Sequence, residues 1–187
     1  MNTTAIIALI VAIVAVAVAV WALMQTRRSK HLKAKFGPEY DRVVSREGDR
    51  GRAEAELSHR EARVKKLNIR DLTPQEQERF AASWRQQQAQ FVDNPRGAVT
   101  EADALVTTIM TARGYPTTDY HTQMSDLSVD HAHVVSNYRE AHEIAEANRN
   151  GKATTEDLRR AMVCYRALAE ALLGRRVVER EPVGLRR

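Results

Sequence analysis

Residues 5–24 read AIIALIVAIVAVAVAVWALM, twenty apolar residues in succession without a charge, a glycine or a proline. At about 1.5 Å per residue, twenty helical residues span roughly 30 Å, the hydrocarbon thickness of a bilayer. In lipid the backbone can satisfy its hydrogen bonds only within a helix, so the β-branched residues do not prevent helix formation. A soluble helix of this length normally keeps a polar face. The stretch predicts a single transmembrane helix within an anchor at residues 1–28.

The placement of charge distinguishes this anchor from a cleaved signal peptide. A signal peptide carries positive charge before a shorter apolar run, but Met1–Thr4 has no charged side chain. Small residues such as Ala17 and Ala19 resemble a cleavage site, so an exported envelope protein with a cleaved signal remains an alternative. The positive charge instead follows the run, at Arg27, Arg28, Lys30, Lys33 and Lys35. By the positive-inside rule, we expect an inner-membrane protein with its N-terminus outside and its C-terminal domain in the cytoplasm.

The same residues predict contacts with the membrane surface. Trp21 is placed near the inner interface, where its amphipathic ring is favoured. Each cation near an anionic surface gains about 1 kcal/mol, and less at high salt. The predicted partners are therefore the lipid bilayer and anionic lipid headgroups. The predicted membrane-interface residues are Trp21, Arg27, Arg28, Lys30, Lys33 and Lys35.

Charge is distributed unevenly along the rest of the chain. Residues 25–72 carry 14 Lys and Arg against 8 Asp and Glu, and residues 175–187 carry 5 against 2. Residues 73–174 carry 10 against 14 and are therefore acidic overall. A nucleic-acid-binding domain concentrates positive charge on the fold itself. We therefore predict no nucleic-acid partner.

Residues 29–72 are expected to form a basic, charged and solvated helical stem. Pro38 suits the first turn of a helix. Gly48 and Gly51 each cost about 1 kcal/mol inside a helix, so a break is expected there. The stem is therefore predicted to consist of two helical pieces.

Residues 73–174 carry repeated helix signals and no strand pattern. Thr73 and Glu76 form a capping box with Pro74 in the first turn, and Asp130 is expected to cap another helix. The residues expected to face inward are Phe80, Trp84, Phe91, Val99, Ala102, Leu105, Val106, Ile109, Tyr120, Met124, Leu127, Val134, Val135, Tyr138, Ala141, Ala145, Leu158, Ala161, Met162, Tyr165, Leu168 and Leu172. The prediction is an all-α protein with a compact four- to five-helix bundle over 73–174 and a disordered basic tail over 175–187.

Three histidines are weak candidates for a metal site. His131 and His133 are two residues apart and would face away from each other on a helix. His131 and His142 share a helix face but would lie about 16 Å apart along its axis. The competing interpretation is a hydrogen-bonded His142 at the edge of the core and an exposed His133. We therefore predict no metal and no cofactor.

No other motif points to catalysis. Glu56-x-x-His59 is half of a di-iron pattern, which needs a second such pair and two further glutamates. Cys164 lies on the inward side of the last expected helix, which favours a buried structural thiol over a nucleophile. The prediction is that the protein is not an enzyme. A helical enzyme or metal-binding protein that uses the histidines stays as an alternative.

Three segments carry a resemblance. FGPEYDR (Phe36–Arg42), ARGYP (Ala112–Pro116) and DLSVDHAHVVSNYREAH (Asp126–His142) resemble a group of bacterial membrane or secreted proteins of unknown function. The resemblance implies a bacterial envelope protein and adds no catalytic residue. Together with the anchor, it leads to the hypothesis of a membrane-tethered helical interaction or scaffolding module with an unidentified protein partner.

Overall fold

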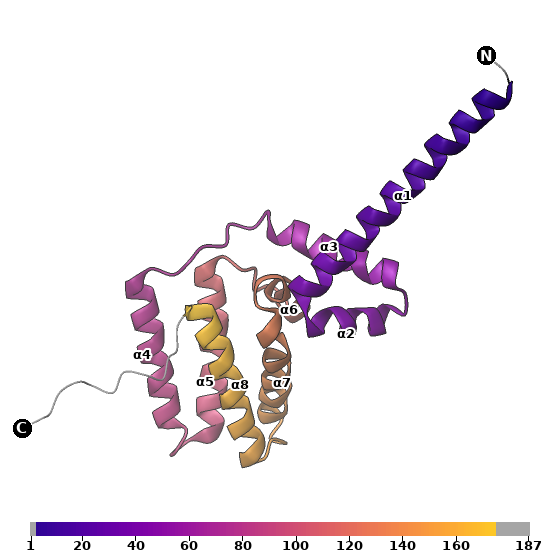
Figure 1. Cartoon of the computed structure of the whole chain (residues 1–187). Coiled ribbons are helices and arrows are strands. Elements are labelled where there is room, and N and C mark those ends of the chain that lie inside the picture. The colour runs from indigo at the N-terminus through magenta and orange to yellow at the C-terminus, as the bar shows by residue number, and fades with distance from the viewer. Residues whose placement is uncertain (1–2, 175–187) are drawn as a thin grey trace, which may run out of the picture. The chain divides into compact units, whose positions relative to one another are not determined.

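The computed structural model describes residues 3–174, with side-chain surroundings from residue 11 onward. This part of the chain is all-α, as predicted, with eight helices and no strand (Figure 1). The helices are α1 (Thr3–Phe36), α2 (Pro38–Glu47), α3 (Arg50–Val64), α4 (Pro74–Gln90), α5 (Pro95–Arg113), α6 (Tyr120–Asp130), α7 (Ala132–Arg149) and α8 (Thr155–Leu173). The tail predicted for residues 175–187 lies outside the described residues.

The chain forms two compact units, residues 1–58 and 59–187, and the division falls within α3. The bundle was expected to start at residue 73, so the structure adds residues 59–72 to it. Two of the added residues show why. Arg63 forms an ion pair with Asp126 of α6, and Leu72 belongs to the core of the second unit.

Helix α1 contains the predicted membrane span. Its large apolar side chains from Val11 to Met24 are all exposed, by between 50% and 66%. Among the described residues it is the one helix long and apolar enough to cross a membrane, judged by length and composition. The helix continues without interruption beyond the basic residues to Phe36.

Glycines separate the helices of the first unit. Gly37 precedes Pro38, which opens α2, and Gly48 ends α2 with a left-handed backbone at φ 65°. A glycine adopts this conformation without the Cβ penalty that other residues pay. The predicted break at Gly48 is confirmed, but Gly51 lies inside the first turn of α3. Residues 29–72 therefore comprise the end of α1, α2 and α3, with a further break at Gly37 that the two-piece prediction did not include.

The solvation predicted for the stem is wrong at several positions. Although the segment is rich in charged residues, several of its apolar side chains are almost completely removed from solvent. Leu32 and Phe36 are 1% and 0% exposed. The buried apolar residues of the segment are Leu32, Phe36, Tyr40, Val43, Ala53, Leu57, Val64 and Leu72. These side chains of the stem are therefore packed inside the protein.

Local signals in the second unit place its helix ends. The predicted capping box is present, with the Thr73 side chain accepting from Glu76 N–H and the Glu76 side chain accepting from Thr73 N–H. Gly114 ends α5 with φ 93°, and a Cβ there would come within 2.5 Å of Asn68 O. Only glycine therefore allows the chain before α4 to pass so close to the end of α5.

The expected cap at Asp130 is wrong. Asp130 is the last residue of α6, and α7 starts at Ala132 without a side-chain cap. The Asp130 carboxylate instead accepts a hydrogen bond from Tyr115 Oη at 3.0 Å. The hydrogen bond from Tyr115, in the loop before α6, therefore replaces the helix-capping hydrogen bond expected of Asp130.

One core fills the second unit. Helix α7 packs most extensively on α8, α8 also packs on α5, and α4 packs on α5. Trp84, Tyr138 and Tyr165 are the largest fully buried side chains. The residues predicted to face inward all lie in this core or pack against it; Phe91, Leu105 and Tyr120 are the partly buried ones. Figure 1 shows α4, α5, α7 and α8 as neighbouring columns of this unit.

Candidate functional site

The predicted membrane-interface residues have different surroundings in the first unit. Trp21 is 64% exposed, and neither Arg27 nor Lys30 has a polar partner among the described residues. Lys33 lies 3.9 Å from Asp41 in a pair exposed to solvent, and Lys35 is half-buried. Trp21 lies in the last turn of the apolar stretch, and the basic side chains follow it on the same continuous helix.

Arg28 differs from Arg27 and Lys30 because it makes hydrogen bonds within the chain. Its Nη2 donates to Ser58 Oγ at 2.8 Å and to Glu54 O at 3.3 Å. Its Nε donates to the same hydroxyl at 3.2 Å. Arg28 therefore joins α1 to α3, which leaves less of its guanidinium for a membrane surface.

Glu54 is the centre of a polar network that joins all three helices of the first unit. Its Oε1 accepts from Ser29 Oγ of α1 at 2.6 Å and from Tyr40 Oη of α2 at 2.7 Å. It also accepts from Arg50 Nε at 2.9 Å, and that Nε donates to Tyr40 Oη at 3.1 Å. Burial acts to raise the pKa of Glu54, but these hydrogen bonds outweigh it and hold that pKa below its ordinary value. Glu54 is therefore a buried carboxylate that stays ionised.

A cavity of about 440 Å³ lies beside this network. Its lining comes from the end of the apolar stretch, the start of the basic cluster and the first turns of α3. The lining residues are Trp21, Gln25, Thr26, Ser29, Lys30, Arg50, Gly51 and Glu54. The cavity therefore combines an exposed indole, two cations and one carboxylate.

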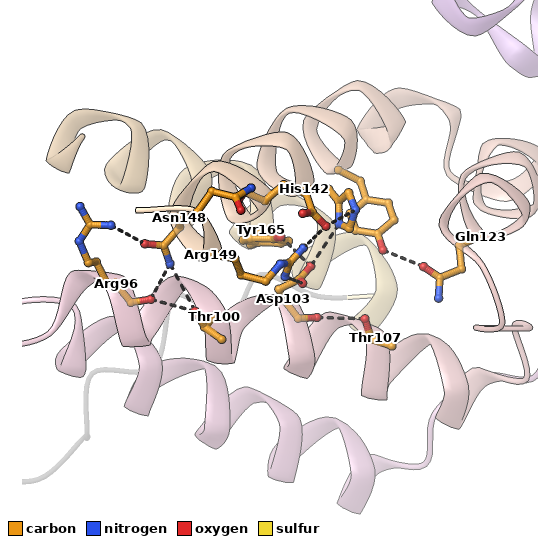
Figure 2. Close-up of polar contacts among 12 residues, drawn as sticks. Arg96, Thr100, Asp103, Thr107, Gln123, His142, Asn148, Arg149 and Tyr165 are labelled. Carbon is orange, nitrogen blue, oxygen red and sulfur yellow. Dashed lines mark hydrogen bonds and ion pairs between the residues drawn. The ribbon is translucent and has the colours of Figure 1, made fainter. Parts of the chain in front are cut away.

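Asp103 is the centre of the corresponding network in the second unit (Figure 2). Its Oδ1 accepts from Tyr165 Oη of α8 at 2.7 Å, and its Oδ2 lies 3.3 Å from Arg149 Nη1 of α7. Burial acts to raise the pKa of Asp103, but His142, Tyr165 and Arg149 hold it below its usual range. Burial and this carboxylate raise the pKa of Tyr165, so its phenol stays protonated. The network joins α5, α7 and α8 through one ionised carboxylate.

His142 lies at the edge of this network, as the competing interpretation of the histidines predicted, but its buried Nδ1 has no hydrogen-bond partner among the described residues, contrary to that interpretation. Its Nδ1 is 3.7 Å from Asp103 Oδ1, and its ring stacks on Tyr120 with centroids 3.9 Å apart. Its side chain is 21% exposed. An aspartate–histidine pair can act as a general base, but a base needs a reacting group within hydrogen-bond reach. The groups that Asp103 contacts here are a protonated phenol and a guanidinium, which suit a structural role.

A second link between α5 and α7 lies further along the same interface. Asn148 Nδ2 donates to Arg96 O at 3.0 Å, and Arg96 Nη1 donates to Asn148 Oδ1 at 3.2 Å (Figure 2). Arg96 Nη2 also donates to Ala153 O in the loop before α8 at 3.1 Å. The two clusters fix the register of α5 against α7 and α8, because each polar group is paired at a defined height along the helices.

His131 and His133 lie closer together than predicted, with ring centroids 6.4 Å apart. The expectation that they face away assumed one continuous helix, but His131 lies between α6 and α7 with φ −130°. His133 is exposed, as expected. Arg113 Nη1 lies 3.2 Å from His131 Nε2 and also donates to Leu172 O at 3.1 Å. Because arginine only donates, Nε2 is the acceptor, which requires a neutral His131 ring.

The surroundings of His131 predict a specific pH dependence of stability. Burial and the Arg113 charge lower its pKa from 6.5 to about 4. Between these values the unfolded chain binds a proton that the folded chain does not, so stability falls as the pH decreases through this window. Chemical denaturation of the full chain in detergent micelles measures this loss. Between pH 6.5 and about 4, the free energy of unfolding should fall by on the order of 1–2 kcal/mol more in the wild type than in His131→Gln, a figure reduced because the ring is partly exposed.

The exposed His133 supplies the control for this measurement. His133→Gln should lose as much stability as the wild type between pH 6.5 and about 4. Equal losses in His131→Gln and the wild type would contradict the assignment of His131 as neutral and half-buried.

The remaining candidate residues form neither a metal site nor a reactive thiol within the described part of the chain. No three His, Cys, Asp or Glu side chains among the described residues lie close enough to hold a metal ion. Cys164 is buried, as predicted, and its Sγ lies 3.7 Å from Glu140 Oε2. Burial and the Glu140 charge raise the pKa of Cys164 to about 11, which disfavours the reactive thiolate.

Sequence reasoning missed Glu54 and Asp103, the two carboxylates that organise the units. Asp103 could have been found, since it falls between the inward positions Val99 and Val106 of one helix. A charge on an inward face needs a buried partner. Glu54 carried no such signal, because it lies among many other charged residues.

Comparison of the chain with known proteins does not identify a role for these sites. No protein-family model, curated protein or solved structure matches it.

Proposed function

We propose that the protein is a single-pass membrane protein in which α1 anchors a helical interaction module on the cytoplasmic side. One observation carries the proposal: a single uninterrupted helix is exposed and apolar at one end and buried at the other. Its residues from Val11 to Met24 expose apolar side chains that water does not favour, whereas Leu32 and Phe36 are fully buried. The same helix is thus suited both to lipid and to the folded protein.

The basic residues support the cytoplasmic orientation. Arg27 and Lys30 have no partner among the described residues, so their charges are free to act in membrane insertion. The alternative is an exported protein whose signal is cleaved. Arg28 and Ser29, just after the apolar stretch, bind α3, which ties this part of α1 into a folded unit.

The second unit supports an interaction role rather than catalysis. Asp103 and Asn148 each form hydrogen bonds with side chains or backbone of neighbouring helices, which fixes the register of these helices. A rigid bundle attached to a membrane is suited to presenting a surface to a protein partner. Crosslinking in membranes followed by mass spectrometry would identify that partner.

Topology reporters test the anchor and its orientation. A fluorescent protein fused to the C-terminus should be active, since it folds in the cytoplasm, and alkaline phosphatase at the same site should be inactive. N-terminal sequencing should find the apolar stretch intact. Active phosphatase would contradict the cytoplasmic assignment, and a shortened chain would support the exported alternative.

A charge-reversal variant tests the cause of that orientation. Arg27, Lys30, Lys33 and Lys35 are replaced by Glu, and a Lys is added before Ala5, while Arg28 is kept because it binds Ser58. We expect the two reporter signals to weaken or exchange, because basic residues near a span are retained on the cytoplasmic side. Unchanged signals would mean that the basic residues do not set the orientation.

A further inference from the structure

The cavity beside Glu54 lies at a definite depth relative to the predicted span. Its lining on α1 starts at Trp21, inside the apolar stretch, and ends at Lys30. At about 1.5 Å per residue, Lys30 lies about 9 Å beyond Met24 along the helix. The headgroup layer of a bilayer is about 5–8 Å thick on each side. If α1 spans the membrane, the cavity therefore opens at the level of the lipid phosphates.

The cations of the cavity have free donors. Lys30 has no polar partner among the described residues. Arg50 uses its Nε for Tyr40 and Glu54, and its two Nη atoms have no partner in the part of the chain that the structure describes. An arginine held in this way offers two parallel N–H groups, which match the oxygens of a phosphate.

Glu54 does not exclude an anion from this cavity. Its Oε1 accepts from Ser29, Tyr40 and Arg50, and its side chain is 8% exposed. Three donors therefore occupy this oxygen, and it holds Arg50 in the lining of the cavity. Lys30 and Arg50 together outweigh its single negative charge, so the cavity carries a net positive charge.

We propose that this cavity binds the phosphate group of an anionic lipid headgroup, with Lys30 and Arg50 as its cationic ligands. Trp21 lies at the membrane end of the cavity, where an indole packs well between headgroup and acyl chain. The net positive charge disfavours lipids whose headgroup also carries a cation, such as phosphatidylcholine. The inference rests on the proposed membrane anchor and adds a defined site to it.

Trp21 is itself a reporter for the occupant. The full chain is placed in nanodiscs of phosphatidylcholine that contain a minor fraction of brominated lipid, and the quenching of tryptophan fluorescence is measured. Trp84 is 0% exposed and supplies a constant signal. Brominated phosphatidylglycerol should quench Trp21 more than brominated phosphatidylcholine at equal content. We expect about a fivefold preference in association, which corresponds to about 1 kcal/mol in total.

The chain offers a matched control for the role of Lys30. Lys30→Gln should remove most of the preference, whereas Arg27→Gln removes the same charge from the same helix outside the cavity and should retain it. Lys30→Arg should also retain it. Far-UV circular dichroism checks that each variant keeps its helices. Equal losses in Lys30→Gln and Arg27→Gln would assign the preference to general surface charge and overturn the proposal.

Two further outcomes separate the possible failures. If added inorganic phosphate displaces brominated phosphatidylglycerol from Trp21, the cavity takes free phosphate and the lipid assignment is overturned. If brominated phosphatidylcholine quenches Trp21 but no headgroup preference exists, the cavity proposal fails and the anchor stands. If neither lipid quenches Trp21, the anchor fails and the cavity proposal falls with it.

Discussion

Replacing Arg63 by alanine is expected to lower the free energy of unfolding by about 3–5 kcal/mol, the usual cost of leaving a buried charge without its partner. Asp126 is fully buried, and Arg63 Nη2 lies 2.7 Å from its Oδ1. Arg63 Nε donates to the same oxygen at 2.8 Å. The other oxygen, Oδ2, has no hydrogen-bond partner among the described residues. Removing Arg63 therefore takes away the cation that the buried Asp126 carboxylate contacts.

A second substitution should reverse much of this loss. Arg63→Ala/Asp126→Asn removes the charge that would otherwise be unpaired, so it should be more stable than Arg63→Ala alone. Thermal unfolding of the full chain in micelles, followed by far-UV circular dichroism, measures both. The nearby Lys65→Ala is the control, since its pair with Glu61 is exposed on the lysine side by 71% and should contribute only about 0.3–0.5 kcal/mol. A loss in Arg63→Ala no larger than that in Lys65→Ala would contradict this account.

The helices that could be predicted are those whose ends carry local signals. The capping box at Thr73 and the glycine at Gly114 act within a few residues of the ends that they set, so sequence spacing identifies them. Asp130 shows the limit of this reasoning. Its side chain had two possible partners, and the one that binds it, Tyr115, lies in a preceding loop.

The long-range pairs that organise the second unit could not be read from local spacing. Arg63 and Asp126 are 63 residues apart, and Asp103 and Tyr165 are 62 apart. A single sequence does not indicate which charged residues form pairs when they are so far apart along the chain. The inward position of Asp103 could still have indicated that a partner was needed, although not its identity.

The burial of the stem could have been predicted, because the sequence carries an apolar helical period there. Leu32, Phe36, Tyr40 and Val43 recur at intervals of three and four residues, which is the period of one helix face. The many charges around them favoured a solvated interpretation. The intervening Gly37 and Pro38 also suggested that the pattern could not be continuous. The structure keeps the face buried across this break.

Phe36→Ala is therefore expected to weaken the stem by about 3–5 kcal/mol, the usual cost of truncating a fully buried phenylalanine. Phe36 is 0% exposed and is the last residue of α1, directly before the turn into α2. The cavity left by its ring should favour local opening, so backbone amides of α2 and α3 should exchange with deuterium far faster in the full chain.

Trp21→Ala is the matched control, because it removes an aromatic ring from the same helix at a position that is 64% exposed. It should leave the exchange of α2 and α3 amides nearly unchanged. Equal exchange in the wild type and Phe36→Ala would mean that the stem is solvated, as its charge content alone suggests. Faster exchange in Phe36→Ala alone would show that the end of the helix, unlike its apolar start, is held by protein. The anchor would then be fixed to the stem through packing as well as through the Glu54 network.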